Sequence, residues 1–168
     1  MSAILTPSPF WGHGTLETFL VHQGCRTATN IRFCPRNGIT ILVADDFEVL
    51  RRLVRQKLLE NGFQAVAEAA DGLEAVKKTA ELQPDLVLLD IAMPKLSGIE
   101  AAARIRLLAP QSKVLFVSQN TDSSIAQLAL SDGAGGYVLK SRIDHELLPA
   151  IEAVLQGKRF ISPDLYPA

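Results

Sequence analysis

The chain has 168 residues, of which 48% are hydrophobic and 21% are charged, and its formal net charge is −1. This composition is that of an average globular protein, and it excludes collagen-like, mucin-like, coiled-coil and fully disordered chains. The balance of 17 basic against 18 acidic residues also lacks the basic excess that nucleic-acid-binding proteins usually carry.

Cysteine content and hydropathy bear on the compartment. The chain has two cysteines, so a disulfide framework does not hold the fold together. No apolar run reaches the roughly 18 residues that a membrane-spanning helix needs. The N-terminus lacks the basic stretch and clean apolar segment of a signal peptide. We therefore expect a cytoplasmic protein without a membrane segment.

Residues 1–38 differ in composition from the rest of the chain and show no sustained helical or strand periodicity. We predict an irregular N-terminal extension, disordered over part or all of its length, with one short helix over about 16–21. The residue types that could bind zinc there are His13, His22, Cys25 and Cys34. Their spacing matches no zinc-site pattern, so we expect no metal site in this segment.

Between residues 39 and 157, short apolar runs alternate with segments of helical periodicity. The predicted strands are 39–44, 63–69, 86–89, 113–117 and 136–139. The predicted helices are 47–60, 72–82, 99–108, 121–131 and 143–156. Strands that are apolar on both faces are typical of a parallel sheet covered by helices on both sides. The sequence thus predicts one doubly wound α/β domain over 39–157, followed by a short tail, 158–168.

Breaker residues set the ends of several predicted helices. Asn61-Gly62 ends the first helix, Pro110 ends the third, and Gly157 caps the last. Pro149 falls inside the last helix, where a proline removes a backbone donor and crowds the preceding turn. We therefore expect a kink at Pro149, or a helix that restarts there.

Polar residues follow four of the five predicted strands. Asp45 and Asp46 end the first strand, Asp90 the third, Ser118 the fourth and Lys140 the fifth. In an open parallel sheet these positions converge on the carboxyl edge, where ligands bind. Three carboxylates in one cleft repel one another, and Mg²⁺ is the hard cation that relieves this repulsion. An aspartate flanked by a metal, an ammonium group and a hydroxyl is equipped to attack phosphorus.

The ordered set of these residues resembles the response-regulator receiver domain, the CheY-like family of two-component signalling, over 39–157. The motifs are Asp45-Asp46 after an apolar strand, Asp90-Ile-Ala-Met-Pro94 with Gly98 after it, Ser118 after Lys-Val-Leu-Phe-Val, and Gly136-Tyr-Val-Leu-Lys140. The resemblance implies a flavodoxin-like sheet of order 2-1-3-4-5 with five flanking helices. No single motif is specific, whereas the whole set at this spacing is.

The same resemblance implies a role for each site residue. Asp90 would accept a phosphoryl group from the phosphohistidine of a sensor histidine kinase, with Ser118 and Lys140 binding that group. Mg²⁺ would be held by Asp45, Asp46, Asp90 and the main-chain carbonyl of Ala92. Ser118 would then move toward the phosphoryl group, and Tyr137 would rotate into the vacated space as the switch. The domain would be a phosphoacceptor with slow autodephosphorylation, not a turnover enzyme.

The signalling surface implied by the family is the fourth helix, fifth strand and fifth helix, residues 121–156, facing a downstream protein or a second copy. Ser141 after Lys140, and the stretch from 146 to 162, resemble the NarL/LuxR-type subfamily, which joins receivers to DNA-binding domains. Six residues follow Ser162, too few for a helix-turn-helix effector. Both a stand-alone receiver and a part of a longer regulator remain open.

Other interpretations compete with this one. The domain could be a phosphorelay intermediate that passes phosphate to a second histidine protein, or a binding module that works without phosphate. An aspartate-nucleophile phosphatase would carry a second acid two residues after Asp90, where this chain has Ala92. Asp46 could serve as an ordinary helix cap, and Tyr137 as a half-buried strand aromatic without a switching role.

The position of Ala92 leads to a kinetic hypothesis. In the family, this position and the one two after the switch hydroxyl, here Asn120, tune dephosphorylation. An alanine side chain cannot orient an attacking water. We therefore expect a long-lived phosphoryl-aspartate.

Overall fold

The computed structural model describes residues 38–131 and 133–165, so the N-terminal extension and its predicted helix lie outside the described residues. The strands are β1 (Thr40–Ala44), β2 (Gln64–Ala69), β3 (Leu86–Leu89), β4 (Lys113–Ser118), β5 (Gly136–Leu139) and β6 (Phe160–Ile161). The helices are α1 (Glu48–Glu60), α2 (Gly72–Leu82), α3 (Gly98–Leu108), α4 (Ser123–Ser131) and α5 (Ile143–Leu155). Short 3₁₀ helices cover Lys140–Arg142 and Pro163–Leu165.

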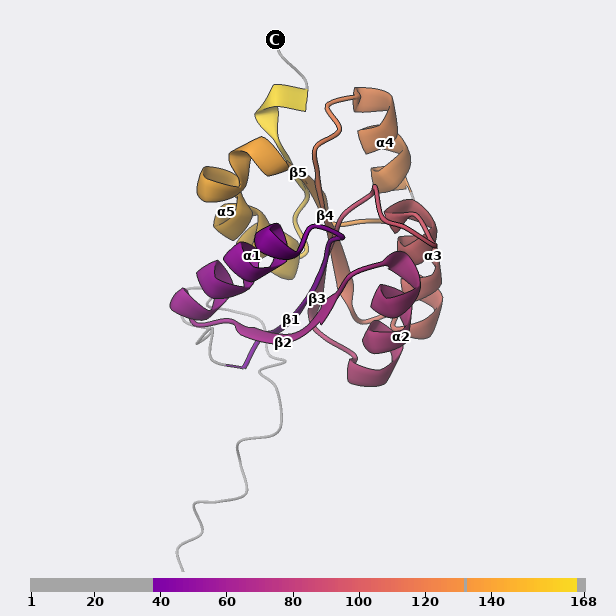
Figure 1. Cartoon of the computed structure of the whole chain (residues 1–168). Coiled ribbons are helices and arrows are strands. Elements are labelled where there is room, and N and C mark those ends of the chain that lie inside the picture. The colour runs from indigo at the N-terminus through magenta and orange to yellow at the C-terminus, as the bar shows by residue number, and fades with distance from the viewer. Residues whose placement is uncertain (1–37, 132, 166–168) are drawn as a thin grey trace, which may run out of the picture. The chain divides into compact units, whose positions relative to one another are not determined.

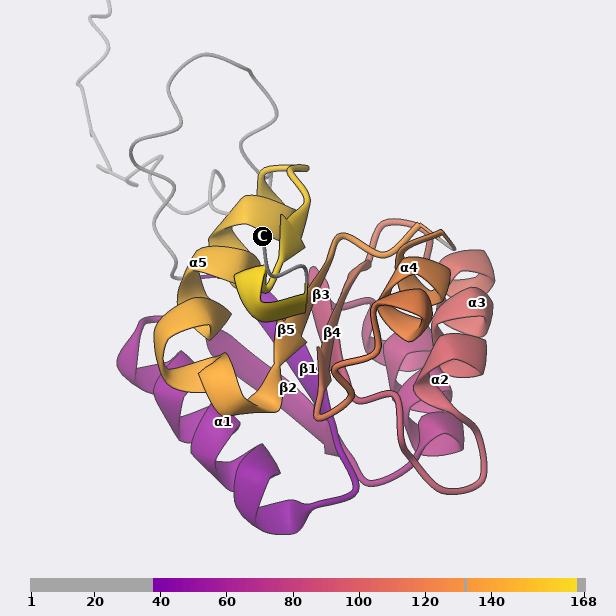
Figure 2. The ribbon, with the colours of Figure 1, turned by 90° about the horizontal axis from the view of Figure 1, so that it is seen from above.

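The strands form one parallel sheet of order β2-β1-β3-β4-β5-β6, with helices on both faces. Helices α1 and α5 cover one face, and α2, α3 and α4 cover the other (Figures 1 and 2). Each face of the sheet has its own hydrophobic core, and alternate residues of β1 belong to one or the other. Ile41 and Val43 pack on the α1–α5 side, and Leu42 and Ala44 pack on the opposite side. Burial on both faces explains why β1, β3, β4 and β5 are continuous apolar runs, whereas the edge strand β2 is partly exposed.

The predicted α/β class and the strand order 2-1-3-4-5 are confirmed, and a sixth strand is added. The sequence predicts a short tail over 158–168, but Phe160–Ile161 pairs with β5 in parallel register. Beyond it, Ser162 and Leu165 are buried against the domain. A strand of two residues is too short to show a period-2 pattern in the sequence. It forms because its backbone pairs with the edge of β5 that β4 leaves free.

Most helix ends agree with the predicted breakers. Asn61 is the C-cap of α1, and Gly62 and Gly157 take positive φ values of 82° and 78°. Helix α5 runs without interruption through Pro149, so it does not restart there. Pro149 and His145 are both exposed, so the carbonyl that loses its helical donor is accessible to water. In the described part of the chain, no helix has the length and hydropathy to cross a membrane.

Candidate functional site

The carboxyl edge of the sheet brings together the polar residues that follow the strands. Ala44 of β1 is in register with Leu89 of β3, so Asp45 and Asp90 emerge at the same level. The backbone N–H of Asp90 donates to the Ala44 carbonyl at 2.9 Å, which fixes that level. On the next two strands of the sheet, Ser118 of β4 lies in register with Leu139 of β5, the residue before Lys140.

Lys140 lies between two of the aspartates. Its Nζ is 2.6 Å from Asp45 Oδ2 and 2.7 Å from Asp90 Oδ2. The side chains are 8%, 6% and 3% exposed for Lys140, Asp45 and Asp90, so the three charges are almost fully withdrawn from water. Burial alone would lower the pKa of Lys140, but its hydrogen bonds to Asp45 and Asp90 together raise it. The lysine therefore stays charged and holds the two carboxylates together.

Asp46 completes a cluster of three carboxylates. One oxygen from each of Asp45, Asp46 and Asp90 lies within 4.8 Å of the others, with Asp46 on the exposed side. Burial raises the pKa of Asp45 above its usual value, against the effect of hydrogen bonds from Lys140 and Phe47. This crowding of hard oxygen donors, open to water on one side, fits Mg²⁺, which keeps several waters and takes few carboxylates.

The backbone around Asp90 is held closely. Its Oδ1 accepts the N–H groups of Ile91 at 2.7 Å and Ala92 at 3.4 Å, which turns the carboxylate into the cleft. Gly98 begins α3 against this turn, and its N–H donates to the Ile91 carbonyl at 2.9 Å. A Cβ at Gly98 would lie 1.9 Å from the Asp90 carbonyl oxygen. Only glycine allows α3 to approach the turn so closely.

Ser118 and Tyr137 are connected through Asn120. The N–H of Asn120 donates to Ser118 Oγ at 3.2 Å, and the Tyr137 hydroxyl donates to the Asn120 carbonyl at 2.8 Å. Tyr137 is completely buried, not half-buried, and its ring lies 6.4 Å from that of Phe116. Burial raises the pKa of Tyr137. The tyrosine therefore already occupies an inward position in this structure.

Sequence reasoning missed a second ion pair that holds the Asp90 loop. Lys95 Nζ lies 2.6 Å from Asp71 Oδ2, and Asp71 also caps α2 by accepting the N–H of Glu74 at 2.9 Å. A Cβ at Gly72 would lie 2.0 Å from the Leu96 carbonyl oxygen, so the loop packs directly on the start of α2. The Asp71-Gly72 pair signalled the helix start, but nothing local links it to a lysine 24 residues away.

This ion pair leads to a prediction about pH. Hydrogen bonds from Lys95 and from the N–H of Glu74 hold the pKa of Asp71 below its usual value. A carboxyl with a lowered folded-state pKa stabilises the fold above its unfolded pKa, and the stabilisation is lost as pH falls through the folded value. We expect Asp71→Asn to lower the free energy of unfolding at pH 7 by up to about 1 kcal/mol, since Lys95 is largely exposed.

Urea denaturation at pH 7 and at a pH below the lowered folded-state pKa of Asp71 measures this effect, because the two chains become alike only once the folded carboxyl is protonated. The difference should close at the lower pH. Glu81→Gln, at an exposed position of α2, controls for the change in net charge. A difference of equal size at both pH values would contradict the role of the Asp71 charge.

Comparisons with known proteins give matches over most of the described chain. Residues 41–152 match the model of the response regulator receiver domain. The transcriptional regulatory protein DegU of Brevibacillus brevis is 38% identical over 128 residues, 76% of this chain and 54% of DegU. The chemotaxis protein CheY of Listeria monocytogenes is 36% identical over 114 residues, 68% of this chain and 96% of CheY.

Solved structures show the same fold. A two-component response regulator of the LuxR family from Aurantimonas matches with a TM-score of 0.72 and 38% identity, covering 75% of this chain and 91% of that one. The receiver domain of a NarL regulator from Mycobacterium tuberculosis matches with a TM-score of 0.68 and 31% identity, covering 71% of this chain and 98% of that one. The chain spans little more than half the length of relatives such as DegU and GacA of Pseudomonas viridiflava.

Proposed function

The chain belongs to the family of response regulator receiver domains, and from this membership we propose that Asp90 accepts a phosphoryl group from the phosphohistidine of a sensor histidine kinase. The observation that carries the proposal is the position of Lys140, bonded to both Asp45 and Asp90 beside the exposed Asp46. One carboxylate would be enough to pair with Lys140 if the lysine only stabilised the fold. Three carboxylates and an ammonium group at one sheet edge suit a phosphoryl group together with a cation.

In the proposed reaction, an oxygen of Asp90 attacks phosphorus while the P–N bond of the phosphohistidine breaks. The products are an acyl phosphate on Asp90 and a free imidazole on the kinase. Mg²⁺, when bound by Asp45, Asp46, Asp90 and the main-chain carbonyl of Ala92, would neutralise charge on the phosphoryl oxygens.

The chain's own residues supply the remaining parts of the reaction. The N–H groups of Ile91 and Ala92 orient the Asp90 carboxylate through Oδ1. Lys140 is close enough to transfer one of its hydrogen bonds from Asp90 to a phosphoryl oxygen. Ser118 would donate its hydroxyl to a second oxygen, for which it would give up its contact with the Asn120 N–H. That exchange links phosphorylation to the Tyr137–Asn120 hydrogen bond.

The proposed output surface differs in one respect from the expected fourth helix, fifth strand and fifth helix. Strand β5 is paired on both sides, and each of its four residues is buried. Strand β6 therefore lies at the sheet edge between α4 and α5. We place the contact with a downstream protein or a second copy on α4, β6 and α5. We also propose that the domain meets its kinase in the cytoplasm.

Ala92 supports a prediction about the lifetime of the phosphoryl group. The side chain at 92 is exposed and apolar, and the Oδ1 atom of Asn120 already accepts the N–H of Asp122 at 2.8 Å. Position 92 therefore offers no polar group to orient a water for hydrolysis, and the amide oxygen of Asn120 is already hydrogen-bonded. We expect Ala92→Asn or Ala92→Glu to shorten the half-life of phosphoryl-Asp90 roughly tenfold, because positioned groups of this kind accelerate proton transfer by larger factors still.

The decay of the phosphorylated mass after removal of the phosphodonor measures this lifetime. Ala92→Val is the matched control, since it adds bulk at the same exposed position without a polar group, and its half-life should equal that of the wild type. A half-life of seconds in the wild-type protein would refute the expectation.

The proposed function is tested by incubating the protein with acetyl phosphate or phosphoramidate and reading its intact mass. With Mg²⁺, the mass should rise by one phosphoryl group, and an excess of chelator should prevent the gain. If the protein gains no mass in either condition, the phosphoacceptor function is wrong, and the domain acts as a binding module through α4, β6 and α5.

A further inference from the structure

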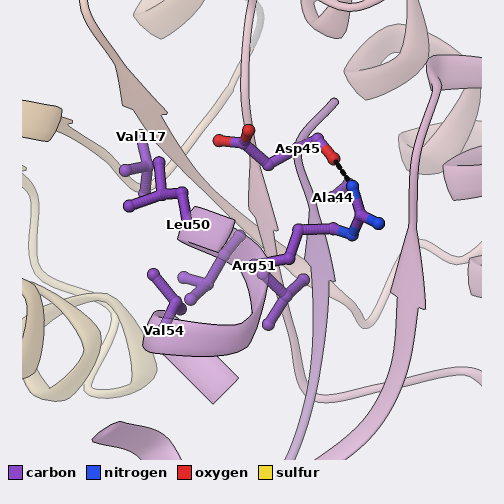
Figure 3. Close-up of a pocket in the computed structure, with 8 residues that line it drawn as sticks. Ala44, Asp45, Leu50, Arg51, Val54 and Val117 are labelled. Carbon is purple, nitrogen blue, oxygen red and sulfur yellow. Dashed lines mark hydrogen bonds between the residues drawn. The ribbon is translucent and has the colours of Figure 1, made fainter. Parts of the chain in front are cut away.

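Arg51 of α1 contacts the main chain of the acidic pair. Its Nη1 donates to the carbonyl oxygen of Asp45 at 2.6 Å (Figure 3). The side chain is only 13% exposed, so this charged group lies largely within the domain, next to the β1–α1 turn. The bond spans six residues and joins the first turns of α1 to the end of β1.

Glu68 forms an ion pair with the same guanidinium. Arg51 Nε lies 3.5 Å from Glu68 Oε2 on β2, and it is a buried nitrogen without a hydrogen-bond partner. Glu68 also pairs with Arg55 Nε at 3.5 Å, one turn further along α1. Arg55 is about half exposed and lies one helical turn further from Asp45. The two arginines thus share one anion, but only Arg51 reaches the acidic pair.

The cavity beside Arg51 is small and mainly apolar. The cavity in Figure 3 has a volume of about 10 Å³ and is lined mainly by apolar side chains, among them Leu50, Val54 and Val117. That volume is close to the minimum for a single water. A substrate therefore has no room there, and the contacts of the guanidinium are its hydrogen bond to the Asp45 carbonyl and its ion pair with Glu68.

We propose that Arg51 is a positioning residue for magnesium, because it fixes the peptide that joins Asp45 to Asp46. A charge-assisted hydrogen bond to the Asp45 carbonyl restricts rotation of that peptide. Both carboxylates project from it, so its orientation sets the separation of their oxygens. The planar fork of arginine reaches Asp45 and Glu68 at once, which a lysine ammonium cannot do with the same geometry. This inference rests on the proposed function.

Magnesium titration of the intact protein by isothermal calorimetry tests the proposal. We expect Arg51→Met to weaken Mg²⁺ binding by about 10- to 100-fold, the range found when groups that orient metal ligands are removed. Methionine keeps an apolar stem at this position and loses the guanidinium. Arg51→Lys should recover part of the affinity, since one ammonium can still reach the Asp45 carbonyl.

Arg55→Met is the matched control. It removes the other arginine bonded to Glu68 without touching Asp45, so Mg²⁺ affinity should remain at the wild-type value. The amide chemical shifts of Asp46 and Phe47 give a second readout, and in the absence of metal they should change in Arg51→Met but not in Arg55→Met. A purely structural arginine would alter the free energy of unfolding without these two effects.

The outcomes separate this inference from the function on which it rests. Wild-type affinity in Arg51→Met would overturn the positioning role and leave the receiver function intact. If Arg51→Met fails to fold, Arg51→Leu replaces it as a variant without a donor to the Asp45 carbonyl, and wild-type affinity in Arg51→Leu would overturn the role equally. A wild-type protein that binds no Mg²⁺ would overturn the magnesium site itself, and the positioning role with it.

Discussion

Asp90→Asn is expected to abolish phosphoryl uptake, with no mass gain from acetyl phosphate under conditions that fully phosphorylate the wild-type protein. The amide has nearly the same shape as the carboxylate, and its carbonyl oxygen can still accept the N–H groups of Ile91 and Ala92. An amide is not a nucleophile toward phosphorus, so the reaction loses its attacking atom. Lys140 keeps its partner Asp45, so the fold should remain intact.

A second aspartate provides the matched control for this experiment. Asp85 is exposed and precedes β3 at the opposite end, where its Oδ2 accepts the N–H and hydroxyl of Thr40, both at 2.8 Å. Asp85→Asn should therefore take up phosphate like the wild-type protein. A mass gain in Asp90→Asn would assign the phosphoryl group to another residue, and peptide mass spectrometry would then identify it.

Lys140→Met is expected to affect both reactivity and stability. Removal of one charged hydrogen-bond donor from a transition state typically costs 10²- to 10³-fold in rate, so phosphorylation should slow by about 100-fold or more. The substitution also leaves Asp45 and Asp90 facing each other nearly buried, without the ammonium between them. Breaking a buried ion pair in this way should lower the free energy of unfolding by about 3 kcal/mol when Mg²⁺ is absent.

Urea denaturation with and without Mg²⁺ separates the two effects. The added cation should restore stability to Lys140→Met more than to the wild-type protein, because it replaces the missing positive charge between the carboxylates. Lys95→Met is the control, since it removes an ammonium at the same distance of 2.6 Å from a carboxylate, but at a site that is 64% exposed. If both variants lose the same small amount of stability, Lys140 does not hold the carboxylates together.

The sequence predicted the helices and strands well because their signals are local. Strands β1, β3, β4 and β5 are apolar runs buried on both faces, and each helix repeats its apolar residues with helical spacing. The edge strand β2 is partly exposed and mixes polar with apolar residues. The start of α3 carried a further local signal that was not used: Ser97 and Glu100 form a reciprocal capping box. The same signals placed the polar residues at strand ends, and parallel pairing then requires those ends to meet at one edge.

Other features arise from contacts between distant parts of the chain. Strand β6 exists because β5 has a free edge to pair with, and Pro149 is tolerated because its side of α5 is exposed. The inward position of Tyr137 depends on the Asn120 carbonyl, which lies 17 residues earlier in the chain. No periodicity or spacing encodes these contacts, so a single sequence gives no local signal for them.

By itself, the sequence determined the α/β class and the set of chemical groups at the carboxyl edge, and the family resemblance implied the strand order. The tertiary structure decided how those groups are bonded: Lys140 to both Asp45 and Asp90, and Arg51 to the main chain before Asp46. The physical reason is the range of the interactions. Hydrophobic periodicity and helix capping act within a few residues, whereas the bonds that orient the site join side chains that only the packing of α1, β3 and β5 brings together.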